Sequence, residues 1–226
     1  HLLLSVSVSA AVKQVASLVR YMLRLSVLNY YGSVHVISHA VGLDTRSASG
    51  LVGLGNHADY LAPFLQTRGE VLLSIGYCRL PKPSKGVIVG FNGQEVERDM
   101  VDLGVTKICP CCLEEDAYHR QAWDLVALTH CPKHGCELIG ACPGCHTKLS
   151  WSRPSLEQCK CSEDLFLDKG NKVVSGPIIS LMKAGYNCTK KVKGIPVLGP
   201  FASLSKRSVV VFHKAVCLLG SFTVHL

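Results

Sequence analysis

Four closely spaced pairs of cysteine or histidine residues lie within one segment of this 226-residue chain. The pairs are Cys109-Pro-Cys-Cys112, Cys131-Pro-Lys-His134, Cys142-Pro-Gly-Cys145 and Cys159-Lys-Cys161. A spacing of two residues lets a tight turn direct both side chains at one metal ion, and proline presets the backbone torsion of such a turn. Gly144 is predicted to tolerate the backbone close to a thiolate. The four pairs match the needs of two tetrahedral zinc ions.

The simplest ligand assignment takes the pairs in sequence order. The first site then contains Cys109, Cys112, Cys131 and His134, and the second contains Cys142, Cys145, Cys159 and Cys161. An interleaved arrangement, with the first pair joining the third and the second joining the fourth, is also compatible with the spacing. Cys111 and Cys136 are the nearest competing ligands, whereas Cys78, Cys188 and Cys217 stand in apolar surroundings and are predicted to be core thiols.

The alternative to zinc is a disulfide framework, because the count of 12 cysteines is even. Their clustering, the adjacent pair Cys111 and Cys112, and the placement of His134 where a fourth ligand is needed all favour zinc. The sequence starts at His1 without Met or a basic region before its first leucines, which does not support a secretory signal. We therefore expect a reducing compartment, a bacterial cytoplasm. No membrane association is expected, because charged residues interrupt every apolar stretch.

Both predicted zinc sites have four protein ligands, which indicates a structural role, since a catalytic zinc keeps a position for water. The signature of zinc deaminases is absent from the sequence. Packing or surface roles are predicted for the histidines near the ligands: His119, His130 and His146. A nuclease would need carboxylates such as Asp99 with Asp102, or Glu114, Glu115 and Asp116. A solvated acidic turn explains them better, so no catalytic residue is predicted and the protein is expected not to be an enzyme.

The formal net charge of +8 is unevenly distributed. Residues 108–168 hold nine Asp or Glu against five Lys or Arg, whereas residues 169–226 hold nine Lys or Arg and no acid. Seven thiolates and two zinc ions would make the zinc segment still more acidic. Any nucleic-acid contact is therefore predicted in the basic segment, at Lys190, Lys191, Lys193, Lys206 and Arg207. A solvated face that aids solubility is the equal alternative.

The predicted fold is α-rich with a small mixed α+β part. Residues 1–78 are predicted to form a helix-turn-helix-like unit, residues 79–107 a linker, and residues 108–168 two zinc-finger or zinc-ribbon modules. Residues 169–226 form a basic C-terminal segment that is expected to be incomplete. Helices are predicted at about 11–28, at 34–41 with Ser33 as the cap, at 59–66 and at 117–128, with Trp123 facing inward. Strands are predicted at 5–9 and 87–89. Helix-turn-helix units read DNA in some proteins and only pack in others, and no cluster of Lys or Arg marks one helix here.

The motifs together resemble the TniQ, or TnsD, family of transposition proteins. The resemblance lies in the Cys-Pro-Cys-Cys-Leu run from Cys109, Trp123, the Cys-Pro-Lys-His-Gly run from Cys131, and the pair Cys142 and Cys145 with Leu149-Ser-Trp151 after it. The helix from Ser17 to Asn29 is similar to the opening helix of the family. The matches cover roughly residues 16–165.

The resemblance implies a target-selection adaptor without a catalytic centre. Proteins of this family connect a target recogniser to the AAA+ ATPase TnsC, which recruits the transposase. The implied partners are TnsC and a CRISPR effector complex with its guide RNA, with target DNA and self-association as further possibilities. The alternative is a TnsD-like protein that binds an attachment site directly.

Overall fold

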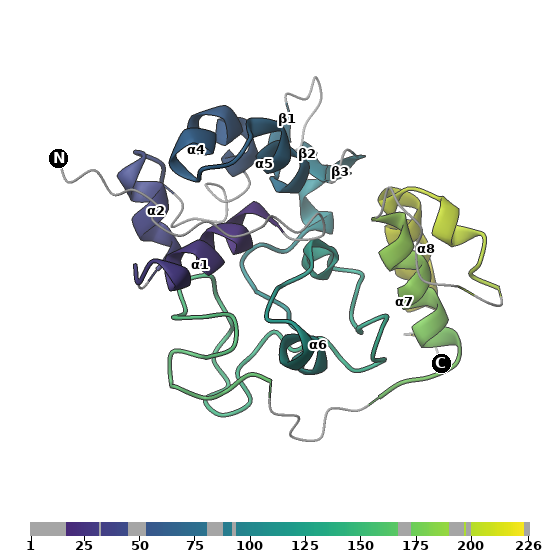
Figure 1. The fold of residues 1–226 in the computed structure, drawn as a ribbon. Helices are drawn as coiled ribbons and strands as arrows, with labels where there is room; N and C mark the ends of the chain where they lie inside the picture. The colour runs from purple at the N-terminus through teal and green to yellow at the C-terminus, as the bar shows by residue number, and fades with distance from the viewer. Residues whose placement is uncertain are drawn as a thin grey trace.

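The computed structural model describes residues 17–31, 33–44, 53–80, 88–91, 94–166, 173–189, 197 and 200–223. The described N-terminal part, called here the helical unit, consists of short helices that gather on one side of the molecule (Figure 1). They are α1 (Leu18–Leu28), α2 (Val34–Ala40), η1 (Leu54–His57), α4 (Ala58–Phe64) and α5 (Gly69–Ile75).

Helix α1 is buried over most of its length, because apolar side chains such as Leu18, Met22 and Leu25 recur at helical spacing. The predicted cap of α2 is confirmed, since the Ser33 side chain accepts a hydrogen bond from the His35 N–H at 3.2 Å. The helix predicted at 59–66 is present as α4. Helix α5 was not predicted from the sequence. The predicted strand at 5–9 and the predicted helical residues 11–16 lie outside the described part.

A small antiparallel sheet follows the helical unit. Its strands are β1 (Cys78–Leu80), β2 (Ile88–Phe91) and β3 (Gln94–Glu97), in the order β1-β2-β3. Val89 lies opposite Arg79 on one side and opposite Val96 on the other. Phe91 and Val96 are buried, so the sheet contributes to the hydrophobic core. The sequence predicted only one strand within segment 79–107, because its prolines and glycines are typical of a linker.

Beyond the sheet, the chain has little regular structure around the cysteines. The described elements are η2 (Arg98–Met100), α6 (Pro110–Glu115) and η3 (Gln121–Asp124), joined by turns and isolated β-bridges. The helix predicted at 117–128 is wrong, because only the single 3-10 turn η3 forms there. The five consecutive residues 121–125 are all buried, which leaves no solvent-facing side for a helix. Trp123 is buried, as predicted.

The C-terminal helices pack against each other and against strand β3 (Figure 1). They are α7 (Pro177–Cys188), the short η4 (Leu204–Lys206) and α8 (Val209–Thr223). The side chain of Gln94 links both helices to β3, since its amide donates to the Cys188 carbonyl at 2.7 Å and accepts from the Val209 N–H at 3.0 Å. Gly185 lets the helices approach closely, because a Cβ there would lie 2.2 Å from the Phe212 ring.

A buried polar network joins the helical unit to the segment that carries the cysteines. Arg20 of α1 forms an ion pair with Asp124 of η3 at 2.5 Å and donates to the carbonyl of Arg120 at 2.9 Å. Tyr77 donates to the other carboxylate oxygen of Asp124 at 2.5 Å. The Arg20 guanidinium also lies 4.5 Å from the centre of the Trp151 ring. The helical unit and the cysteine-rich segment therefore share one buried junction.

The predicted fold class is confirmed: the structure is mostly helical, with a short hairpin sheet and two clusters of Cys and His side chains. The domain boundaries at residues 78, 107 and 168 stay a prediction. Among the described residues, no helix combines the length and apolar character needed to cross a membrane.

Candidate metal centres

The first cluster begins at the N-terminus of helix α6. Cys109 is the N-cap residue, and its sulfur accepts a hydrogen bond from the Cys112 N–H at 3.4 Å. Pro110 occupies the first position of the helix, where no backbone N–H is needed. One turn of helix therefore directs the sulfurs of Cys109 and Cys112 to the same side.

A tight turn supplies the other half of the first cluster. The turn is closed by the Gly135 N–H, which donates to the Cys131 carbonyl, and by the Cys131 N–H, which donates to the Cys136 carbonyl, both at 2.7 Å. Gly135 has a φ of +72°, and a Cβ there would lie 2.8 Å from the carbonyl oxygen of Val174. Glycine is required at this position for both reasons, and the turn brings Cys131 and His134 together.

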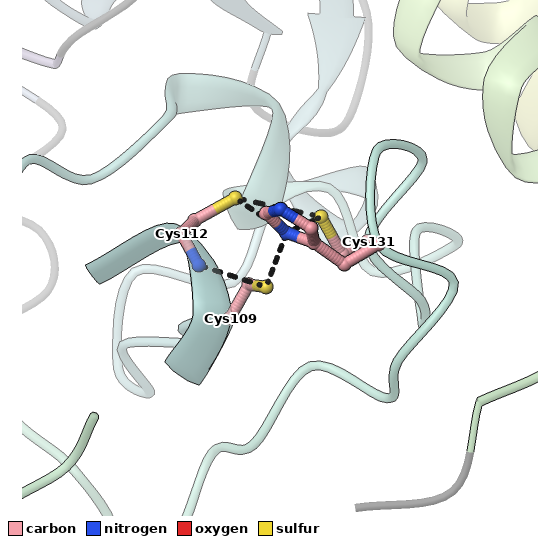
Figure 2. A group of neighbouring side chains, drawn as sticks. Cys109, Cys112 and Cys131 are labelled. Atoms are coloured by element: carbon pink, nitrogen blue, oxygen red, sulfur yellow. Dashed lines mark hydrogen bonds between the residues drawn. The ribbon is translucent and has the colours of Figure 1, made fainter. Parts of the chain in front are cut away.

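The four groups of the first cluster surround a common point (Figure 2). The Nδ1 atom of His134 lies 3.4 Å from the sulfur of Cys109, 3.3 Å from that of Cys112 and 3.7 Å from that of Cys131. The sulfurs of Cys112 and Cys131 are 3.6 Å apart. All three cysteines are buried.

The imidazole of His134 is oriented from its outer side by Glu115. Its Nε2 atom lies 3.0 Å from one carboxylate oxygen of Glu115, and the other oxygen accepts a hydrogen bond from the Lys133 ammonium. With the proton on Nε2, Nδ1 presents its lone pair to the three sulfurs, as in carboxylate–histidine–zinc arrangements. Glu115 is thus a residue of the metal centre that the sequence reasoning placed in a solvated acidic turn.

The second cluster is built from two tight turns that resemble the turn from Cys131 to Cys136 in the first cluster. Isolated bridges between Ala141 and Lys148 and between Gln158 and Asp164 flank the two turns. The four sulfurs, from Cys142, Cys145, Cys159 and Cys161, lie within 4.8 Å of one another. The sulfurs of Cys142 and Cys161 are 3.6 Å apart, and those of Cys145 and Cys159 are 3.8 Å apart. Cys145 and Cys161 are exposed, so this cluster lies nearer the surface than the first.

Left-handed backbone positions complete both turns of the second cluster. They fall on His146, with a φ of +58°, and on Ser162, with a φ of +69°. Gly144 was predicted to allow a close approach of the backbone to a thiolate. The group that its missing Cβ accommodates is the Glu163 carboxylate, whose oxygen would lie 2.8 Å from a Cβ at that position.

The spacing of the sulfur and nitrogen atoms fits zinc in both clusters. Bonds of about 2.3 Å to sulfur and about 2.0 Å to nitrogen give tetrahedral edges of about 3.8 Å and 3.5 Å. The separations of 3.3 to 3.8 Å in the two clusters agree with these edges. The hydrogen bond between Cys109 and Cys112 lowers the pKa of Cys109 to about 7 and raises the pKa of Cys112, so the two sulfurs compete for one proton. A bound metal requires both sulfurs as thiolates.

The structure therefore groups the eight predicted residues in sequence order, and the interleaved arrangement does not occur. The two clusters suggest two metal sites. The competing cysteines stand beside the first cluster: Cys109, Cys111 and Cys136 form an additional group with sulfurs within 4.8 Å. Of the predicted core thiols, Cys188 is buried, Cys78 is half-buried and Cys217 is exposed.

The three histidines near the clusters lie outside both ligand groups. His119 is buried and packs against the rings of Trp123 and Trp151, with centroid distances of 4.6 and 5.7 Å. His130 is half-buried and His146 is exposed. Of the residues predicted to contact nucleic acid, Lys206 and Arg207 are exposed, whereas Lys190, Lys191 and Lys193 lie outside the described part.

The helical unit, the hairpin sheet and the two clusters together define a small, mostly helical protein that carries two compact groups of Cys and His ligands. The model of the TniQ family matches residues 12–138, which is more than half of the chain, and the chain belongs to this family. A comparison with curated proteins finds no match.

Membership of the TniQ family implies a role in target selection during DNA transposition, within the transposition machinery. Proteins of the family are generally non-catalytic. The matched segment contains the helical unit, the hairpin sheet and the whole first cluster, and it ends before the second cluster.

Proposed function

We propose that each cluster binds one structural zinc ion. The first ion is held by Cys109, Cys112, Cys131 and His134, and the second by Cys142, Cys145, Cys159 and Cys161. Each set supplies four donors with tetrahedral spacing, which leaves no position for water or substrate on the metal. The ions hold together turns that have little regular structure of their own.

The zinc proposal is tested by metal analysis of the purified chain. We expect two zinc ions per chain in the unmodified protein and one after Cys142→Ser. Cys217→Ser is the matched control, because this cysteine is exposed and lies outside both clusters, and it should retain two ions. Fewer than two ions in the unmodified protein would contradict the proposal.

We propose further that the protein is a non-catalytic adaptor in target-site selection for DNA transposition. It links a target recogniser, a CRISPR RNA-guided effector complex, to the AAA+ ATPase TnsC and through TnsC to the transposase. The observation that carries this proposal is the family match over the helical unit and the first cluster as one continuous segment. The closed ligand sets also support a scaffolding role for the metal.

Surface chemistry favours protein partners over DNA at the clusters. Segment 108–168 is acidic by sequence, and the thiolates of bound zinc sites add negative charge, which opposes contact with phosphates. Helix α8 exposes apolar side chains from Val211, Leu218 and Leu219, whose spacing of seven and eight residues places them on one face. Removing exposed apolar side chains from water at an interface with another protein is favourable, so such a face is typical of a protein-binding surface.

Capture of TnsC by the immobilised, zinc-loaded protein tests the adaptor proposal. We expect TnsC and the effector complex to be retained together, and retention to fall after Cys142→Ser but not after Cys217→Ser. A zinc-loaded protein that retains neither partner would refute the linking role.

A second function, direct binding to an attachment site, is favoured by the exposed cations Lys206 and Arg207 in a segment without acidic residues. A mobility shift with DNA alone tests it as a function of salt. Neutralising both residues should reduce the slope of log affinity against log salt by about 2 if each contacts one phosphate. Arg68→Gln, which removes an exposed charge of the helical unit, is the control. An unchanged slope would exclude phosphate contacts at these two residues.

A further inference from the structure

The first cluster contains more sulfur than one zinc ion requires. Besides its three cysteine ligands, the sulfurs of Cys111 and Cys136 belong to a second group that shares Cys109, with all three sulfurs within 4.8 Å. No function proposed above uses either of these two thiols. They differ in position, because Cys136 is buried and Cys111 is half-buried.

The Cys136 sulfur lies directly against the ligands of the first site. It is 3.2 Å from the Cys109 sulfur, closer than the edge of about 3.8 Å expected between two sulfurs bound to the same tetrahedral ion. Its carbonyl accepts from the Cys131 N–H at 2.7 Å, and its backbone pairs with Val173 in an isolated bridge. The backbone therefore fixes Cys136 beside the site, outside the four-donor set.

His134 and Cys136 differ in their exposure to solvent. The side chain of His134 is 18% exposed and depends on an exposed carboxylate, Glu115, for its orientation. The Cys136 residue is only 1% exposed. The outer donor can thus rotate away into solvent, whereas the inner thiol has no such path.

We propose that Cys136 is a reserve ligand of the first metal site, which takes the place of His134 when the imidazole leaves the ion. The exchange turns a Cys₃His site into a Cys₄ site, and the Cys136 proton passes to solvent or buffer as the thiolate binds. Zinc prefers both donor sets, so the ion keeps four ligands throughout. This inference rests on the proposed zinc sites, and it concerns metal retention instead of the choice of target.

Metal content of four proteins tests the exchange: the unmodified chain, His134→Ala, His134→Ala with Cys136→Ser, and His134→Ala with Cys111→Ser. We expect two zinc ions in the unmodified chain and in His134→Ala. The double variant with Cys136→Ser should hold one ion, and the matched double variant with Cys111→Ser should hold two. Loss of an ion from His134→Ala alone, or equal metal content in the two double variants, would overturn the proposal.

Cobalt substitution gives a second readout that does not depend on stoichiometry. Sulfur-to-cobalt charge transfer should rise by about one-seventh in His134→Ala, as the thiolates bound to two ions increase from seven to eight. Cys136→Ser alone should leave the absorption of the otherwise unmodified protein unchanged, because His134 is then still bound. A drop in that variant would make Cys136 a resident ligand and refute the reserve role.

The test separates this proposal from two alternatives. Three ions in the unmodified chain would indicate a further ion bridged through Cys109 to Cys111 and Cys136, which contradicts a reserve role. Fewer than two ions there would refute the proposed zinc sites themselves. If His134→Ala does not fold, release of zinc to a chelator is measured instead, and it should be several-fold faster from Cys136→Ser than from Cys111→Ser. Equal rates would overturn the proposal.

Discussion

Replacing Asp124 by Asn tests the junction between the helical unit and the cysteine-rich segment. Both partners of the ion pair are withdrawn from water, since the side chains of Arg20 and Asp124 are 1% and 0% exposed. The carboxylate also accepts from the Tyr77 hydroxyl at 2.5 Å. The substitution preserves shape but removes the charge that compensates Arg20.

The expected loss follows from the cost of burying an unpaired charge. Burial lowers the pKa of Arg20 to about 10 and raises the pKa of Asp124, and the attraction between the two groups opposes both shifts. The pair therefore stabilises little in itself, but removing one partner of a buried pair costs about 3–5 kcal/mol. For a chain of this length, that corresponds to a Tm lower by about 6–20 °C.

The matched control is Glu70→Gln, the same change from carboxylate to amide in an exposed pair. Arg68 and Glu70 are 2.9 Å apart, but their side chains are 78% and 81% exposed. We expect a loss of at most about 1 kcal/mol there. Thermal unfolding is followed by circular dichroism with zinc present, and metal content is checked to show that both clusters are intact. Equal Tm values for the two variants would refute the argument that the buried pair holds the junction together.

Three further substitutions test local features. Burial lowers the pKa of Lys107 from 10.5 to about 8, so the unfolded chain binds more protons between these values and stability should rise with pH there, by up to about 1.4 kcal/mol per unit. Urea unfolding at pH 8 and pH 10 should show this rise of the free energy of unfolding in the unmodified protein and a smaller rise in Lys107→Met. The same rise in both proteins would argue against Lys107 as its source. His146→Gly should raise the free energy of unfolding by about 1 kcal/mol, since glycine adopts a φ of +58° without steric cost, and a loss of stability would contradict this. Glu115→Ala should weaken zinc binding at the first site about 10–100-fold in competition with a chelator, because His134 loses its orienting partner. The exposed neighbour Glu114→Ala is the control and should leave the affinity unchanged.

The ligand clusters were predictable from the sequence because their determinants are local. A turn of a few residues directs Cys131 and His134 to one point, and the N-terminus of a short helix does the same for Cys109 and Cys112. Ser33 predicted the start of α2 for the same reason. Each of these features depends on a few neighbouring residues, whose identities the sequence shows directly.

The features that the sequence did not predict depend on residues far apart in the chain or on patterns too short to recognise. The ion pair of Arg20 and Asp124 spans 104 positions, and nothing near either residue marks its partner. The hairpin sheet was not predicted because its strands have only three or four residues and lie among prolines and glycines. The alternation of apolar and polar residues along such strands is too short to recognise. The helix predicted around Trp123 failed because burial on all sides, imposed by the junction, outweighed local helical spacing.

The first metal site and the buried junction are mechanically linked through one loop. Residues 113–130 connect the two ligand pairs of this site, and η3, with Asp124 at its end, lies within that loop. A metal that closes the loop restricts where Asp124 can lie, and Asp124 in turn fixes Arg20 of α1. The Gln121 amide, which donates to the Ile75 carbonyl at 3.4 Å, connects the same loop to α5. Loss of the first zinc should therefore loosen the helical unit as well as the ligand turns. The second cluster also reaches the junction, through Trp151, which lies between its ligand pairs and 4.5 Å from the Arg20 guanidinium.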